Sequence, residues 1–127
     1  MNTEKAELFT PAPEWSGRSD GPGPEHARWH SVINQSTDSP APITLLGFAS
    51  DEGVLRNGGR QGAAAGPAAL RSALGSLAVH HKHALADAGT ITTQADDLDG
   101  AHDALSDKVQ KLCCLLYTSD AADEEDS

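Results

Sequence analysis

Two segments of the chain pair an apolar run with a helical pattern, and the first of these begins at residue 43. Residues 43–48 are almost entirely apolar, which predicts a short strand buried on both faces in a parallel sheet. Residues 67–79 then repeat apolar side chains at the i, i+3, i+4 and i+7 spacing of one helix face. Pro67 suits the first helical turn, and Gly75 is expected to weaken or end the helix. The apolar positions are Leu70, Ala73, Leu74 and Leu77.

The second segment repeats this order of strand and helix. Residues 84–92 predict a short strand with a turn at residues 87–89, and residues 96–112 predict an amphipathic helix. The expected buried stripe of that helix is Leu98, Ala101, Leu105, Val109 and Leu112. Strand, helix, strand, helix is the pattern of an α/β fold. We therefore assign residues 43–112 to two β-α units of one domain.

The first 42 residues are rich in proline, glycine, serine and glutamate and carry few apolar side chains. This composition predicts an extended amino-terminal arm over residues 1–42, with one short helix around residues 25–33. Trp15 and Trp29 are its large anchors, and we expect them to pin the arm onto the sheet. The alternative is that they stack on a ligand.

The chain has 127 residues and a formal net charge of −10. This acidic balance argues against nucleic acid or an anionic membrane surface as a partner. No apolar run approaches the ~18 residues of a membrane span, and the amino terminus lacks the pattern of a signal peptide. We therefore expect a cytoplasmic protein. Cys113 and Cys114 are adjacent, which fits neither a disulfide framework nor a zinc site.

The candidate chemistry lies in the polar, glycine-rich loop of residues 49–66. Arg56 and Arg60 flank two glycines there, and guanidinium groups bind carboxylates or phosphates through paired hydrogen bonds. An anion site is therefore one hypothesis. The alternative is structural: the glycines serve tight turns, and the arginines pair with Asp51 and Glu52.

Two other clusters raise the question of a metal site. Three histidines stand at positions 80, 81 and 83, but neighbouring side chains on a helix diverge and no carboxylate or cysteine accompanies them at ligand spacing. We expect a solvated helix end there. The run of residues 99–103, Asp-Gly-Ala-His-Asp, falls inside the second predicted helix. We expect neither cluster to bind metal.

The same loop resembles a known family. Its segments Ser50-Asp51-Glu52-Gly53-Val54, Arg56-Asn57-Gly58-Gly59-Arg60 and Gly62-Ala63-Ala64-Ala65-Gly66-Pro67 are similar to the first strand–loop–helix of the ureohydrolases, the arginase and agmatinase superfamily. Within it, the formimidoylglutamase family is the nearest in pattern. The resemblance extends back to Trp15-Ser16-Gly17-Arg18-Ser19-Asp20 and forward to about Leu112, covering about residues 11–112.

The resemblance implies the amino-terminal part of a three-layer α/β/α fold with a mostly parallel sheet. Full-length members are implied to be hydrolases with two manganese ions, to convert N-formimidoyl-L-glutamate and water to L-glutamate and formamide in histidine degradation, and to form homo-oligomers. Their metal-ligand motifs, Gly-Gly-x-His, Asp-Ala-His-x-Asp and Asp-x-Asp, do not occur here. We therefore expect no metal on this chain and no activity from it alone. The substrate-binding candidates are Arg56, Asn57 and Arg60.

Two alternatives to this assignment remain open. One is a fragment of another ureohydrolase, acting on agmatine or a guanidino acid. The other is a non-enzymatic α/β module for anion binding or assembly.

Residues 113–127 do not continue the α/β pattern. They resemble the conceptual translation of a sequencing adapter, so we expect the native segment to end near Leu112. The alternative is a natural acidic disordered tail, since the segment holds five acidic residues and no lysine or arginine.

Overall fold

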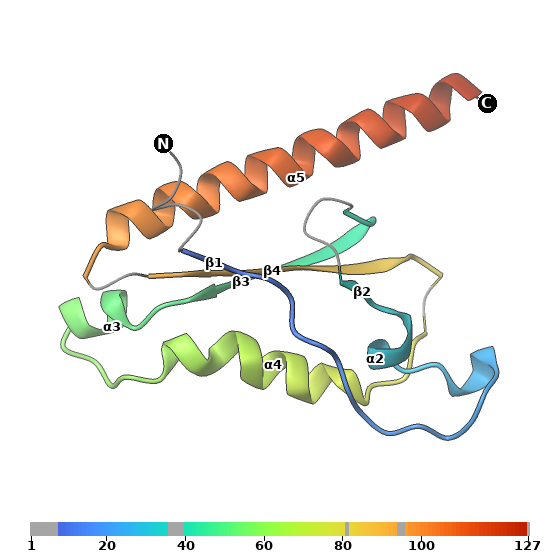
Figure 1. The fold of residues 1–127 in the computed structure, drawn as a ribbon, viewed down its shortest axis with the longest axis horizontal. Coiled ribbons are helices and arrows are strands. Elements are labelled where there is room, and N and C mark those ends of the chain that lie inside the picture. The colour runs from blue at the N-terminus through green and yellow to red at the C-terminus, as the bar shows by residue number, and fades with distance from the viewer. Residues whose placement is uncertain (1–7, 36–39, 81, 94–95, 127) are drawn as a thin grey trace.

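The structure is a computed structural model that describes residues 8–35, 40–80, 82–93 and 96–126, with side chains described as far as residue 115. Its centre is the strand β4, Leu85–Thr92 (Figure 1). β3, Ile43–Ala49, runs parallel to β4 over its whole length, from the pair Ile43 and Leu85 to the pair Ala49 and Thr92.

Two short strands from the amino-terminal arm complete the sheet. β1, Phe9–Thr10, pairs antiparallel with the carboxyl half of β4, and β2, Asn34–Gln35, pairs parallel with its amino half. Because β3 occupies one edge of β4, β1 and β2 must share the other edge. The sheet is therefore mixed, with two parallel pairings and one antiparallel pairing.

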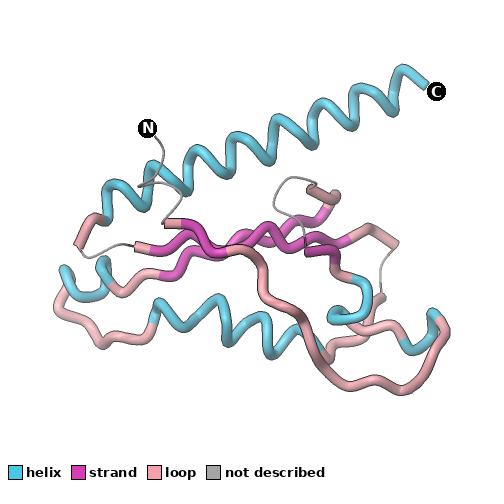
Figure 2. The backbone as a smooth tube through the Cα atoms, in the orientation of Figure 1, coloured by secondary structure: helices cyan, strands magenta, loops and turns pink. Residues whose placement is uncertain are grey.

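The two longest helices lie on opposite faces of this sheet. α4, Gly66–Gly75, packs below it and α5, Leu98–Asp126, lies above it in the view of Figure 1. Figure 2 shows the shorter helices in the connections around these layers. They are η1 (Pro24–His26), α2 (Trp29–Val32), α3 (Glu52–Arg56) and η2 (Ala63–Ala65).

A small apolar core fills the space between the sheet and α5. Leu8, Ile91 and Ala104 are its buried members. Phe9 and Phe48, from the strands on either side of β4, pack against them while remaining half-exposed. Burial of these side chains holds α5 on the sheet.

Both predicted strands and both predicted helices are present, so the α/β class is confirmed. The expectation that residues 43–48 are fully buried is wrong, because all seven residues of β3 are only partly buried. β3 has one neighbouring strand among the described strands, whereas β4 has neighbours on both edges. An edge strand keeps one side open to solvent.

The predicted apolar face of the first helix is also wrong. Leu70 is 64% exposed and Leu77 is 50% exposed, and Leu77 lies beyond the end of the helix at Gly75. The side of α4 that faces the sheet instead carries Arg71, which bonds to β4, and Gly75, which is buried. The expectation that Gly75 ends the helix is confirmed.

The second helix differs from its prediction in length and in face. It was expected to end at residue 112, but α5 continues to Asp126. Val109 was placed in the buried stripe and is 45% exposed, whereas Ala104, which the stripe omitted, is buried. The buried row Ala101, Ala104 and Leu112 follows one side of the helix.

The expected turn at residues 87–89 is absent, because β4 runs straight through these positions. Its irregularity is a register shift opposite Leu45 and Gly47, where β4 carries one extra residue. Gly89 accommodates the shift with φ of +104°, a conformation that favours glycine. The loop of residues 49–66 is likewise more ordered than expected, since α3 and η2 lie within it.

The amino-terminal arm is less extended than expected. It supplies β1 and β2 to the sheet, and the single helix expected around residues 25–33 is divided into η1 and α2. Within the described part of the chain, none of the helices has the length and apolar character needed to cross a membrane.

Candidate functional site

The loop that follows β3 is closed on itself by Asp51. One carboxylate oxygen, Oδ1, accepts hydrogen bonds from the backbone N–H groups of Gly62 at 2.9 Å and Ala64 at 3.0 Å. These backbone bonds, with that from Gly62 the strongest, lower the pKa of the Asp51 carboxyl below its usual 3.8. Asp51 therefore joins the start of the loop to η2, eleven or more residues further along the chain.

Arg56 is held by contacts within the protein. Its Nε donates to Glu52 Oε1 at 3.1 Å, one helical turn back, and its Nη2 donates to the carbonyl oxygen of Asp96 at 2.9 Å. The alternative that the loop arginines form ion pairs within the loop is thus correct for Arg56 and Glu52. It is wrong for Asp51, which binds backbone N–H groups and no arginine.

Asn57 and Arg60 lie on the solvent side of the same loop. Asn57 caps the carboxyl end of α3, where its backbone N–H donates to Gly53 O. Arg60 is exposed and makes no hydrogen bond or ion pair to another described residue. The structure therefore brings the three substrate-binding candidates, Arg56, Asn57 and Arg60, onto one loop beyond the carboxyl end of β3. Their role in substrate binding remains a prediction.

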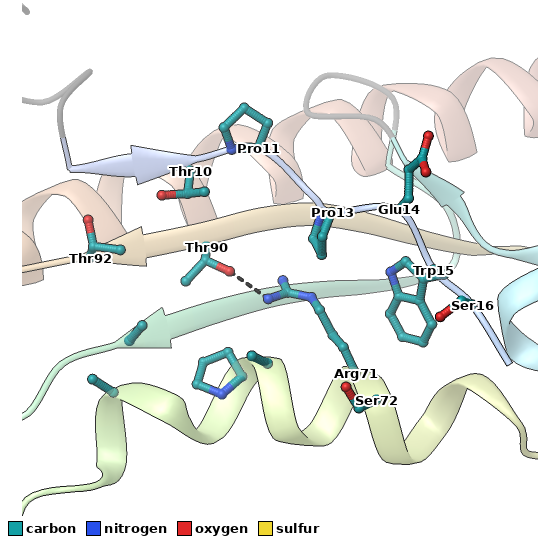
Figure 3. Close-up of a pocket in the computed structure, with 14 residues that line it drawn as sticks. Thr10, Pro11, Pro13, Glu14, Trp15, Ser16, Arg71, Ser72, Thr90 and Thr92 are labelled. Atoms are coloured by element: carbon teal, nitrogen blue, oxygen red, sulfur yellow. Dashed lines mark hydrogen bonds between the residues drawn. The ribbon is translucent and has the colours of Figure 1, made fainter.

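A cavity of about 390 Å³ lies between the arm, β4 and α4, and Ala49 and Ala64 at the two ends of the loop also line it (Figure 3). Thr10 and Trp15 line it from the arm, Thr90 from β4, and Arg71 from α4. None of the three loop candidates lines it. The side chain that dominates this cavity, Arg71, was not among the predicted site residues.

Arg71, which lines the cavity, forms a buried ion pair with Asp87. Arg71 Nε donates to Asp87 Oδ2 at 2.8 Å and Nη2 donates to Asp87 Oδ1 at 2.9 Å, which is a bidentate geometry. Nη2 also donates to Gly89 O at 2.8 Å, and Nη1 donates to Thr90 Oγ1 at 2.6 Å (Figure 3). The Asp87 side chain is fully buried and that of Arg71 is 11% exposed.

The amino-terminal arm and the backbone of β4 also bind the Asp87 carboxylate. The Trp15 indole Nε1 donates to Asp87 Oδ2 at 2.8 Å, and the backbone N–H of Gly89 donates to Oδ1 at 3.0 Å. The Asp87 carboxylate thus accepts four hydrogen bonds, and four of the five guanidinium N–H groups are used. The expectation that Trp15 pins the arm onto the sheet is confirmed. The cluster's evident role is to fasten the arm, α4 and β4 together.

Residue types alone could have pointed to this cluster. An arginine on the inward side of a helix and an aspartate within an apolar strand are both costly to bury unless they pair. Each of these residues interrupts the repeat of apolar positions in its element, so the prediction from that repeat gave neither of them a role. Their pairing with each other, in contrast, follows only from the fold, which packs α4 on one face of the sheet.

The described residues contain no group of three His, Cys, Asp or Glu side chains arranged to hold a metal ion. His80 and His83 are exposed, and His81 lies outside the described residues. His102 stands on α5, where its ring lies 5.8 Å from that of Phe48. The aspartates at positions 99 and 103 are exposed on the same helix.

Comparison with known proteins connects this chain to one enzyme family, although no family model matches it. The chain is 45% identical over 104 residues to a formimidoylglutamase of Nocardia farcinica, a match that covers 80% of this chain and 34% of that protein. It is 44% identical over 100 residues to one from Rhodococcus opacus, covering 77% and 31%. It is 48% identical over 106 residues to one from an Enterobacter species, covering 80% and 34%.

The fold and these matches agree on the class of protein. The chain is an α/β protein built on a mixed sheet, and its sequence is similar to formimidoylglutamases over about four fifths of its length. The resemblance drawn from the loop of residues 49–66 is thereby confirmed. The chain spans about a third of the length of the curated relatives it matches.

Proposed function

We propose that this chain is the amino-terminal part of a formimidoylglutamase, a hydrolase that converts N-formimidoyl-L-glutamate and water to L-glutamate and formamide. The observation that carries the proposal is 45% identity over 104 residues to a protein of that name. The substrate is a small molecule, and no described feature calls for nucleic acid or a membrane as a partner. Histidine degradation, a cytoplasmic location and assembly of the whole enzyme into homo-oligomers belong to the same proposal.

We assign residues 43–112 to the first two β-α units of a three-layer α/β/α ureohydrolase domain, with residues 1–42 as its arm and 113–127 as a non-native tail. The positions of α4 and α5 on opposite faces of the sheet support this assignment. The parallel pairing of β3 with β4 supports the mostly parallel sheet.

The metal requirement is assigned to the whole enzyme and not to this chain. In such a hydrolase, two manganese ions would supply an activated water and stabilise the negative charge that develops during attack. The described residues offer no fitting set of donors, because no three His, Cys, Asp or Glu side chains come together. The chain alone is therefore expected to be inactive.

The contribution of this chain is a loop that binds the substrate. N-formimidoyl-L-glutamate carries two carboxylates, and guanidinium groups bind carboxylates with charge-assisted hydrogen bonds. Arg60 is exposed without a described ion-pair partner, so its guanidinium is available to a ligand. Arg56 is held by Glu52 and Asp96, so it offers a fixed positive charge. Asn57 follows it on the same loop, is exposed, and offers a side-chain amide.

The test is a full-length chimera in which this chain's matched segment replaces the corresponding segment of the Nocardia farcinica relative. We expect the chimera, with manganese, to release L-glutamate and formamide from N-formimidoyl-L-glutamate, and the 127-residue chain alone to release none. Agmatine and guanidino acids serve as alternative substrates. A folded chimera that prefers either of these, or hydrolyses none of them, would contradict the proposal.

The loop assignment is tested in the same chimera with Arg60→Ala. Loss of one charge-assisted contact removes ~1.5–3 kcal/mol, which lowers kcat/KM by roughly 10- to 160-fold, chiefly through KM. Lys82→Ala is the matched control, since Lys82 is also an exposed cation but precedes β4 at the opposite end of the sheet. Equal kinetics for both variants would remove Arg60 from the binding site.

A further inference from the structure

The helix α3 ends in a cap that depends on glycine. The N–H of Gly58 donates to Leu55 O at 3.1 Å. The N–H of Gly59 donates further back, to Val54 O at 2.8 Å. Gly58 has φ of +71°, a left-handed conformation that favours glycine. These two bonds and this dihedral define a Schellman motif, with Asn57 at the C-cap position and Gly58 directly after it. The cap therefore places a glycine immediately after an asparagine.

An asparagine followed by glycine is chemically labile. The backbone nitrogen of the glycine can attack Cγ of the asparagine side chain, because a residue without Cβ leaves that approach open. The N–Cγ bond forms and the Cγ–Nδ2 bond breaks, and Nδ2 leaves as ammonia with the proton of the glycine amide. The product is a five-membered succinimide ring. Water opens the ring at Cγ to give aspartate, or at the backbone carbonyl carbon to give isoaspartate, and no oxidant or reductant takes part.

The Asn57 side chain is accessible to this reaction. It is exposed and makes no hydrogen bond to another described residue, so it is free to rotate and water reaches its Cγ. Asn57 is also the one asparagine in the sequence that precedes glycine. Asn34 is equally exposed, but it lies in β2 and precedes Gln35, whose side chain hinders attack. The chain thus contains its own control.

The closed cap holds the attacking nitrogen away from Cγ. To form the ring, the nitrogen of Gly58 must lie on the same side of the Cα–C bond as Cβ of Asn57. The ψ angle of Asn57 is 4°, so that nitrogen instead eclipses the nitrogen of Asn57 itself. Its N–H is also engaged with Leu55 O. The reaction therefore requires the cap to open.

α3 is suited to local opening. It has five residues, none of them buried, and it contains Gly53, which lowers the stability of a helix. Segments with few buried contacts open at free energies far below that of global unfolding. The cap can therefore release Gly58 while the sheet stays folded.

We propose that Asn57 is a site of spontaneous deamidation, gated by opening of the Schellman motif at the end of α3. Both products place a carboxylate on the loop between Arg56 and Arg60. Isoaspartate also adds a methylene to the main chain of the cap. The loop thereby loses positive charge as the protein ages. The consequence for substrate binding rests on the proposed function, whereas the deamidation itself does not.

Peptide mass spectrometry on the incubated 127-residue chain and on the full-length chimera tests the modification. We expect the peptide that contains Asn57 to gain the mass difference between an amide and an acid, with isoaspartate among the products, while the peptide that contains Asn34 stays unchanged. The rate should rise in proportion to hydroxide concentration, because the attacking amide must lose its proton. Aspartate without isoaspartate would overturn the succinimide route.

The unfolded chain in urea sets the rate of the open state. We expect the folded chain to deamidate roughly 10- to 100-fold more slowly, because opening a single exposed helical turn costs little free energy. A folded chain that is protected more than ~1,000-fold would overturn the proposal, since that requires an opening free energy close to that of global unfolding.

The gate is tested with Gly53→Ala. A Cβ at Gly53 meets no atom within 4 Å, so alanine stabilises α3 and should slow deamidation by ~2- to 5-fold in the folded chain. Ser72→Ala is the matched control, because it raises helix propensity at an exposed position of α4. We expect Ser72→Ala to leave the rate unchanged. Equal slowing by both variants would mean that the reaction passes through unfolding of the whole chain, which would overturn the gate.

The consequence for binding is measured in the chimera with Asn57→Asp, which introduces the charge of the product. A like charge near a substrate carboxylate should raise KM by about fivefold. Asn34→Asp adds the same charge on β2, beside the amino half of β4, and should leave KM unchanged. Deamidation at Asn57 with equal KM in both variants would retain the modification and remove the loop from substrate binding. An active chimera in which Asn57 never deamidates would do the reverse.

Discussion

At the scale of single residues, the Arg71–Asp87 pair decides how the arm is held. Asp87 is fully buried, so its charge depends on the guanidinium and on Trp15 for compensation. Removing one partner from such a pair leaves a buried charge and costs ~3–5 kcal/mol. We therefore expect Arg71→Ala to lower the free energy of unfolding by about that amount, measured by urea denaturation. It should also free the arm, which Trp15 fluorescence reports.

The matched control for this prediction is Arg56→Ala. Arg56 makes an ion pair with Glu52 at a similar distance, but its side chain is 51% exposed. Exposed pairs contribute about 0–1 kcal/mol, so the loss should be small. A similar loss of unfolding free energy in both variants would show that the burial of Asp87 does not increase the contribution of its ion pair to stability.

Asp51 makes the stability of the loop depend on pH. Hydrogen bonds from Gly62 and Ala64 keep its folded-state pKa below the 3.8 of an unperturbed aspartate. The carboxylate's contribution to stability is therefore complete above pH ~4 and is lost as the pH falls through the lower folded-state pKa. We expect Asp51→Asn to flatten the decline of the unfolding free energy that the parent chain shows as the pH falls below ~4.

The control for this pH dependence is Asp103→Asn, at an exposed position on α5. It should leave the acid decline as it is in the parent chain. Urea unfolding at several pH values checks both variants. A parent-like decline in Asp51→Asn would mean that Asp51 does not contribute to the acid sensitivity of the fold.

Residue patterns alone located the loop but not the buried pair. Arg56, Asn57 and Arg60 were chosen because charge beside glycine is visible in the sequence. Arg71 and Asp87 lie 16 residues apart and meet only because α4 packs on one face of the sheet that contains β4. Such a contact depends on packing between elements, which periodicity within one element does not describe.

At the scale of elements, the irregularity in β4 brings the arm into the sheet. Gly89 has φ of +104°. A Cβ added there would lie 2.6 Å from Thr10 O and 2.7 Å from the Phe9 ring, and these two residues form β1. We expect Gly89→Ala to lower stability by ~1–3 kcal/mol, because backbone strain and this clash add. Hydrogen exchange should show faster exchange in β1 and in Thr92, whose N–H bonds to Leu8 O.

Gly53→Ala is the matched glycine substitution. Gly53 lies within α3, and a Cβ there meets no atom within 4 Å. Replacing a helical glycine with alanine stabilises by about 0.4–1 kcal/mol. Opposite signs for the two substitutions are the expected result, and a destabilised Gly53→Ala would indicate that α3 has an unseen neighbour.

The sequence located elements better than it located their faces and ends. The strands β3 and β4 and the approximate starts of α4 and α5 were visible because proline, glycine and apolar runs mark them, whereas β1 and β2 in the arm were not predicted. The face of α4 was misjudged because Leu70 is exposed and Arg71 faces the sheet. The end of α5 was misjudged because helical backbone persists beyond the last buried side chain, Leu112.

At the scale of the whole molecule, the core is small for the length of the chain. Among the described residues, the buried apolar cluster consists of Leu8 beside β1, Ile91 on β4 and Ala104 on α5. Large apolar side chains of α4 and α5, Leu70 and Val109, are exposed to solvent. Domains that bury so little are marginally stable. The unpaired edge of β3 adds a site for aggregation. The isolated chain is therefore expected to unfold with low cooperativity and to gain stability in a longer protein.

The carboxyl-terminal segment is where sequence and structure differ most at this scale, and a deletion resolves its role. α5 extends to Asp126, yet Leu112 is the last buried side chain described, and Cys113 and Cys114 are exposed. If residues 113–127 are foreign to the fold, deleting them should change the unfolding free energy by less than about 0.5 kcal/mol. Leu112→Ala in the full chain should cost ~2–5 kcal/mol, because it leaves a cavity between α5 and the sheet. Denaturation of both variants measures the contrast. A deletion as costly as Leu112→Ala would mean that the last turns of α5 belong to the folded domain, and the boundary at Leu112 would then be wrong.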